Sequence, residues 1–163
     1  MGFIYCLSAL DKLVHDLVIH EMVEIFAGRR TPTPKYLSES ISIDNHRALA
    51  QATLPPAELV FEGIVRGKLR HLSFMDPEKL VGALSLVWLE NHKWQEVAND
   101  MGRDHAGVVT ELKNLHARRN AIVHETDRDP NTGSKMPITP NDVERAELFV
   151  SALGESLCKL VLR

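Results

Sequence analysis

The chain has 163 residues, a formal net charge of −3 and two cysteines; 44% of its residues are hydrophobic and 25% are charged. This length suits one domain over residues 1–163, and the composition excludes a wholly disordered chain, a disulfide-rich scaffold and a strongly basic binder of long nucleic acid. Cys6 and Cys158 lie far apart without CxxC spacing, so we expect a reduced, cytoplasmic protein without signal peptide or membrane span.

Apolar periodicity predicts a long first helix. From residue 3 to 27 apolar side chains recur at helical spacing, and Gly28 is a natural stop. Because this run begins without an N-cap residue, the sequence is compatible with a piece of a longer protein. Residues 29–42 are predicted to form a loop, followed by a short helix that Asp44 caps and that ends near Ala52.

The middle of the sequence also indicates helices. The two prolines at 55–56 suit the first turn of a helix that runs to about Leu72. Asp76 is predicted to cap the next helix, which carries apolar residues inward through Trp88. A short helix follows and ends at Gly102.

Two further helices complete the predicted order. Asp104 begins a helix that continues to about Asp127, and the turn-rich residues 128–138 follow it. Thr139 and Pro140 are a strong start for a last helix. No segment has the alternation typical of a strand, so we predict an all-α protein.

Polar side chains late in the helix from 104 to 127 are predicted to share one face. At 3.6 residues per turn, Arg119, Asn120 and His124 fall within one arc of about 140°, together with His116. This arc borders the apolar stripe of the helix, so a partly buried polar cluster is expected. Arg118 falls on another side of the helix.

These residue types suit phosphodiester chemistry. A histidine shuttles protons at neutral pH, and an arginine presents donors that match phosphate oxygens. In RNA the 2′-hydroxyl is an internal nucleophile, so such a pair can cleave without metal or cofactor. The spacing alone is not specific, because Arg66 with His71 and Arg118 with His124 also match it. The alternative for Arg119 and His124 is a helix-end salt bridge and an interface histidine.

The flanking sequence supplies the specificity. The string Arg-Arg-Asn-Ala-Ile-Val-His-Glu at 118–125, the following turn and Pro137-Ile138-Thr139 resemble the HEPN superfamily, and most closely the RiboL-PSP-HEPN group. Segments near Asp11 and near Asp76 are also similar to that group.

This resemblance implies a bundle of about five to seven helices that forms a homodimer, with two copies of the motif meeting in a composite, metal-independent ribonuclease site. Arg119, Asn120 and His124 occupy the motif positions. Supporting roles are assigned to three neighbours, His116, Arg118 and Glu125. Neither a metal nor a cofactor is implied.

The resemblance also suggests a biological role. Members of this class often serve as toxins or in phage defence by cutting RNA, and the implied partners are RNA, an antitoxin or a fused effector domain. The alternative is a non-catalytic module that binds an antitoxin, a nucleotide or a larger defence protein. Asp11 and His15 are four residues apart, and they form either a polar pair that supports the fold or the site, or an ordinary pair on the helix surface.

Overall fold

The computed structural model describes residues 2–124, 133–134 and 137–163, and the side chain of His124 is outside this description. Within these ranges the protein forms eight α-helices and no strand. The all-α prediction is therefore confirmed, although the described helices exceed the predicted number by one. The HEPN-like arrangement and the dimer stay predictions.

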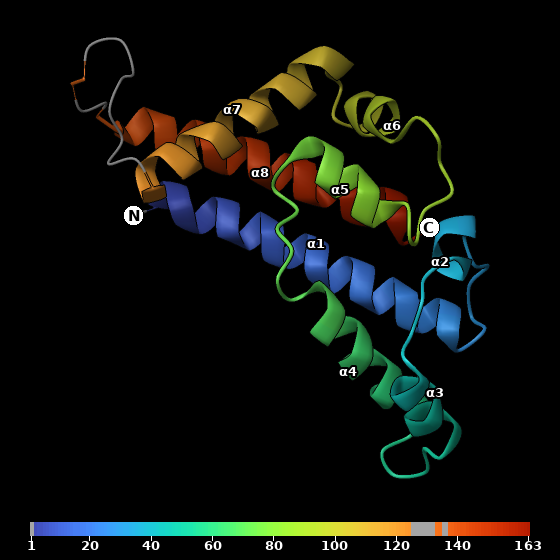
Figure 1. Cartoon of the computed structure of the whole chain (residues 1–163). Coiled ribbons are helices and arrows are strands. Elements are labelled where there is room, and N and C mark those ends of the chain that lie inside the picture. The colour runs from blue at the N-terminus through green and yellow to red at the C-terminus, as the bar shows by residue number, and fades with distance from the viewer. Residues whose placement is uncertain (1, 125–132, 135–136) are drawn as a thin grey trace.

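The two longest helices, α1 (Gly2–Phe26) and α8 (Pro140–Val161), lie side by side and form the centre of the molecule (Figure 1). Burying a large apolar side chain stabilises a fold by roughly 1.5–3 kcal/mol, so this helix pair contributes much of the core's stability. The side chains with essentially no exposure include Leu7, Leu10, Val14, Leu153 and Leu157. Thr139 and Asp142 form a capping box at the start of α8, which confirms the predicted helix start.

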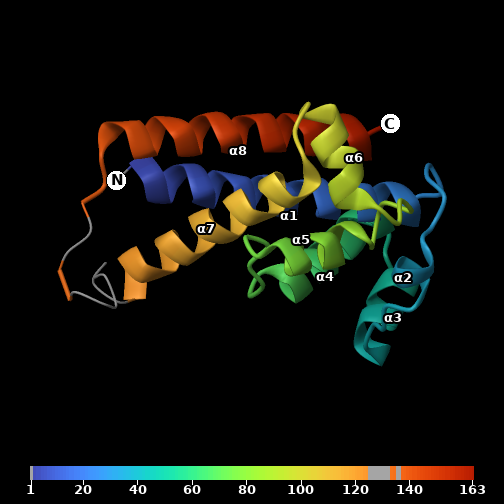
Figure 2. The same ribbon diagram turned by 90° about the horizontal axis from the view of Figure 1, so that it is seen from above.

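The other helices pack along this pair, and α8 forms one edge of the molecule (Figure 2). Helices α4 (Ala57–Leu69) and α5 (Pro77–Leu84) pack on α1, while α6 (Lys93–Asp100) packs on α8 and on α7 (His105–His124). Seen from above, α7 crosses α1 obliquely, and its second half diverges from α1 toward the end of the bundle where α1 begins (Figure 2). The α7 residues of the motif therefore lie at one end of the bundle.

The predicted loop at residues 29–42 contains a short helix, α2 (Pro34–Leu37). Its N-cap is Thr33, whose hydroxyl oxygen accepts the Tyr36 N–H at 3.0 Å and lies 2.9 Å from the Leu86 carbonyl, to which it donates. The loop prediction is wrong here because the helix is only four residues long, too short to show apolar periodicity, although its cap is local.

Three predicted helices have other boundaries in the structure. Helix α4 begins at Ala57, so Pro56 is its N-cap rather than part of its first turn, and it ends at Leu69 instead of near Leu72. Helix α3 (Ile43–Ala50) is capped by Ser42, whose hydroxyl accepts the Asn45 N–H at 3.1 Å, so Asp44 lies inside the helix rather than at its cap. Helix α5 ends at Leu84 instead of continuing toward Trp88, because the buried Leu86 and Val87 enter the core from turns after the helix.

Candidate active site

The first half of α7 is fastened to the core. The carboxylate of Asp104 accepts the Gly107 N–H at 2.5 Å and so caps the helix, as predicted. Val108 and Leu112 have no exposure, and Leu115 and Ile122 pack against the core while staying partly exposed. Each buried residue holds one turn of α7 in place, so the position of the following turns is fixed from this end.

The second half of α7 carries a hydrogen-bonded chain of three half-buried side chains. Arg119 donates from Nη1 to Oδ1 of Asn120 at 3.1 Å. The Nδ2 atom of Asn120 lies 3.1 Å from Nε2 of His116, one turn earlier. Intermediate burial weakens competition from water while leaving the groups reachable, so a polar cluster of this kind can bind an anionic group.

The predicted site is brought together only in part. Arg119, Asn120 and His116 form the chain, and His124 is the last residue of α7, four residues after Asn120. The side chain of His124 and the whole of Glu125 lie outside the described residues. Val123, which follows Ile122 on the same half of the helix, is 45% exposed, so this side of α7 faces solvent rather than the core.

Arg118 belongs to a different surface. Its guanidinium donates to the Pro137 carbonyl at 3.4 Å, and it lines a groove of about 750 Å³ between α7 and the first turns of α1 and α8. The described lining of this groove does not include Arg119, Asn120 or His116. The two adjacent arginines therefore face different surroundings, in line with the helical-wheel analysis.

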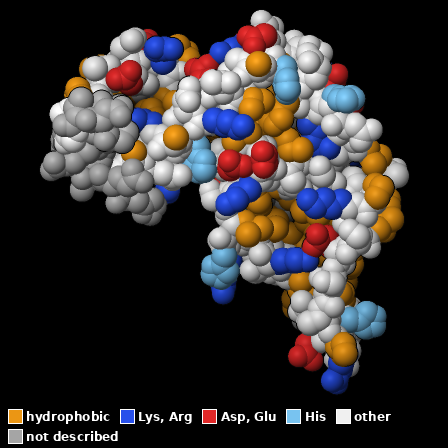
Figure 3. All heavy atoms as spheres, turned by 45° about the horizontal axis from the view of Figure 1, so that its top comes forward, with side chains coloured by type: hydrophobic (Ala, Val, Ile, Leu, Met, Phe, Trp, Pro, Cys, Tyr) orange, Lys and Arg blue, Asp and Glu red, His pale blue; other side chains and the backbone are white. Residues whose placement is uncertain are grey.

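The groove beside Arg118 carries both signs of charge. Arg118 and Arg145 line it together with Glu111 and Asp142. The backbone and side-chain hydrogen bonds of Thr139 hold the pKa of the Asp142 carboxyl below its usual range, with a smaller effect from the nearby arginines. Figure 3 shows the same mixture on one face of the molecule, where basic and acidic side chains are interspersed. Contacts with a polyanion on this face would therefore be local rather than continuous.

Asp11 and His15 do not form a polar pair with each other in the way the sequence suggested. The carboxylate of Asp11 accepts the backbone N–H of Phe74 at 2.6 Å, and His15 lies 3.0 Å from the Leu72 carbonyl through Nε2. The His15 ring also packs on the ring of Phe74, with centroids 4.4 Å apart. Both side chains therefore fasten the segment between α4 and α5 onto α1.

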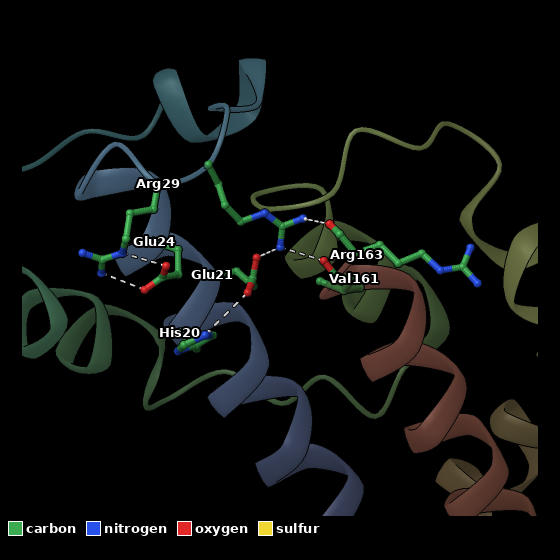
Figure 4. Close-up of polar contacts among 7 residues, drawn as sticks. His20, Glu21, Glu24, Arg29, Val161 and Arg163 are labelled. Atoms are coloured by element: carbon green, nitrogen blue, oxygen red, sulfur yellow. Dashed lines mark hydrogen bonds and ion pairs between the residues drawn. The ribbon is translucent and has the colours of Figure 1, made fainter.

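A buried ion pair at the other end of the bundle was not predicted from the sequence. Glu21 on α1 is only 2% exposed and pairs with Arg30, which follows the turn after α1. Arg30 also donates to the carbonyl of Val161, the last residue of α8, at 2.7 Å and to the Arg163 carbonyl beyond the helix at 3.0 Å (Figure 4). Sequence patterns give no signal for the bonds from Arg30 to Val161 and Arg163, because more than a hundred residues separate these partners.

No family model, curated protein or solved structure matches this chain. Among the described residues there is no group of three or more histidine, cysteine, aspartate and glutamate side chains that could hold a metal ion. None of the helices in the described ranges has both the length and the apolar character needed to cross a membrane.

Proposed function

We propose that this protein is a metal-independent endoribonuclease whose site is built from Arg119, Asn120 and His124. The observation that supports it most is the hydrogen bond between Arg119 and Asn120, which holds a guanidinium half-buried on the same helix as His124. A held guanidinium loses less conformational entropy on binding a phosphate than a freely moving one.

The reaction follows from the residue types. His124 takes the proton of an RNA 2′-hydroxyl, whose oxygen forms a bond to the adjacent phosphorus. The bond from phosphorus to the 5′-oxygen breaks, that oxygen gains a proton, and the products carry a 2′,3′-cyclic phosphate and a 5′-hydroxyl. Arg119 stabilises the charge that develops on the phosphoryl oxygens, and Asn120 orients Arg119.

The first test is cleavage of RNA in EDTA by the purified protein. We expect wild type to cut and to leave cyclic phosphate ends, and we expect the Arg119→Ala and His124→Ala variants to lose at least about a hundredfold in rate. His105→Ala, at the first position of the same helix, is the matched histidine control and should cut like wild type. An oligonucleotide with one 2′-deoxy position should resist cleavage there. Equal cleavage by all variants would contradict the proposed site.

A homodimer is part of the proposal, because one protomer supplies only one motif arginine and one motif histidine. In a composite site, groups from both protomers act on one phosphate. Arg119→Ala and His124→Ala chains refolded together should then recover part of the activity that each lacks alone. No recovery in a mixture shown by light scattering to be dimeric would contradict the composite arrangement.

The proposed biological role is that of a toxin or phage-defence effector, by analogy with the HEPN proteins that the motif resembles. Induced expression in a bacterial host should then arrest growth and fragment cellular RNA. The His124→Ala variant, expressed to the same level, should do neither. Growth arrest by both proteins would separate the toxicity from RNA cleavage.

One observation favours the alternative of a non-catalytic interaction module. Helix α3 has no buried residue. Its first residue, Ile43, is 80% exposed, and Leu54, in the connection from α3 to α4, is 92% exposed. Exposed apolar groups of this kind suit contact with a second protein. A protein that fails to cut RNA but loses partner binding on Ile43→Asp would support this alternative.

A further inference from the structure

The side-chain amide of Asn120 lies between two groups, one of which needs a hydrogen-bond acceptor and the other a donor. Nη1 of Arg119 is 3.1 Å from Oδ1, and Nε2 of His116 is 3.1 Å from Nδ2. A guanidinium only donates hydrogen bonds, so the amide oxygen must face Arg119. The amide nitrogen, which also only donates, must then face His116.

This arrangement determines the tautomer of His116. Nε2 has to accept the hydrogen bond from Asn120, so the ring proton must be on Nδ1. A proton on Nε2 would place two donors 3.1 Å apart. Turning the amide would not relieve this clash, because its NH₂ group would then face Arg119, which is always charged.

We propose that His116 is a positioning residue. As the Nδ1–H tautomer it fixes the amide of Asn120, and through that amide it fixes the guanidinium of Arg119. One hydrogen bond joins adjacent residues and the other joins residues one turn apart, all on a single helix, so no other element is needed to hold these three side chains together. Its value for cleavage rests on the proposed ribonuclease activity, whereas the tautomer itself is a property of the folded protein.

The tautomer can be measured without any activity. Long-range ¹H–¹⁵N spectra of the labelled protein distinguish the two ring nitrogens, and the His116→Leu variant assigns the signals. We expect Nδ1–H for His116 and the Nε2–H form, which is commoner in free imidazole side chains, for the exposed His105. An Nε2–H ring at His116 would overturn the inference.

Substitution of Asn120 provides the complementary test. Asn120→Asp presents an acceptor on both sides, so the ring of His116 should change to a form protonated on Nε2. Asn120→Leu removes the donor, and the ring should then resemble that of His105. An unchanged His116 spectrum in both variants would show that Asn120 does not set the tautomer.

Cleavage kinetics test whether the positioning matters. His116→Gln keeps an acceptor at the right place, because glutamine and asparagine four residues apart form a hydrogen bond on a helix. We expect it to cut within about threefold of wild type, while His116→Leu should lose about ten- to a hundredfold, as for other residues that orient a functional group. Equal rates for the two variants would overturn the positioning role. A wild-type protein that cuts no RNA would refute the proposed function, and the spectra would still decide the state of His116.

Discussion

The two ends of the bundle are held together in different ways. At one end, Arg30 joins the buried Glu21 of α1 to the carbonyl of Val161 at the end of α8 and to that of Arg163 (Figure 4). At the other end, the second half of α7 diverges from α1 (Figure 2) and carries the half-buried polar chain and the exposed Val123. We call these the tied end and the open end.

The difference shows where this fold can keep reactive groups. At the tied end the charged groups of Glu21 and Arg30 bind each other and backbone carbonyl groups, and removing Arg30 leaves the carboxylate of Glu21 buried without its counter-charge. Polar groups at the open end are held by neighbours on their own helix, so they can remain partly exposed to a ligand. A candidate site is therefore expected at the open end, provided that the first half of α7 keeps it in place.

The largest expected effect concerns that anchoring. Leu112→Ala should lower the free energy of unfolding by about 4 kcal/mol, because it leaves a cavity under a side chain with no exposure. Val123→Ala on the same helix should change it by less than about 0.5 kcal/mol. Urea denaturation followed by circular dichroism measures both. Similar losses for the two variants would mean that the open end is as tightly packed as the rest of the helix.

The tied end provides the next largest effect. Arg30→Ala should cost about 3 kcal/mol, because the carboxylate of Glu21 would stay buried without its cation. Arg29→Ala is the matched control, since Arg29 pairs with Glu24 and Glu58 at the surface, where ion pairs contribute little. If Glu21→Gln together with Arg30→Ala is as unstable as Arg30→Ala alone, the unpaired charge is not the cause.

A smaller effect is expected at the start of α8. Thr139→Ala removes the cap that accepts the Asp142 N–H at 3.2 Å, and should cost about 1 kcal/mol. Thr139→Ser keeps the hydroxyl and should lose much less. Thermal unfolding of the three proteins at neutral pH measures the difference, and equal midpoints for the alanine and serine variants would show that the cap contributes nothing.

The smallest effect depends on pH. Because the pKa of Asp142 is lower in the folded protein than its ordinary value of 3.8, the charged carboxylate stabilises the fold above that value. This contribution is lost as the pH falls through the lower, folded pKa. The stability advantage of wild type over Asp142→Asn should therefore be constant near neutrality and decrease only below about pH 4. An advantage that persists at the lowest pH would show that it does not come from the charge.

The helix starts could be predicted from the sequence wherever the cap is local. Asp76, Asp104 and Thr139 each bind an N–H within three residues of themselves, so a short stretch of sequence contains the whole signal. Helix α2 has an equally local cap, Thr33 before Pro34, but it is only four residues long and so too short to show the apolar periodicity on which the helix predictions rest. The further hydrogen bonds from Thr33 to the Ser85 and Leu86 carbonyl groups are long-range and have no pattern in a single sequence.

The candidate site follows the same rule. The proximity of His116, Arg119 and Asn120 was predictable because all three lie within two turns of one helix. The contact between Arg118 and Pro137 was not predictable, because it depends on how the chain returns from α7 to α8, and the periodicity of a helix does not describe that connection. The likeness to HEPN proteins, the RNA substrate and the dimer stay predictions.

The attachment of the segment between α4 and α5 has a consequence for evolution. Asp11 and His15 hold this segment through the Phe74 amide and the Leu72 carbonyl, and neither takes part in the proposed chemistry. Selection for folding alone would preserve an acidic residue and a histidine at this spacing. In an alignment of relatives, invariance at these two positions would indicate selection for the attachment of this segment to α1. Invariance at Arg119, Asn120 and His124 would instead indicate selection for activity.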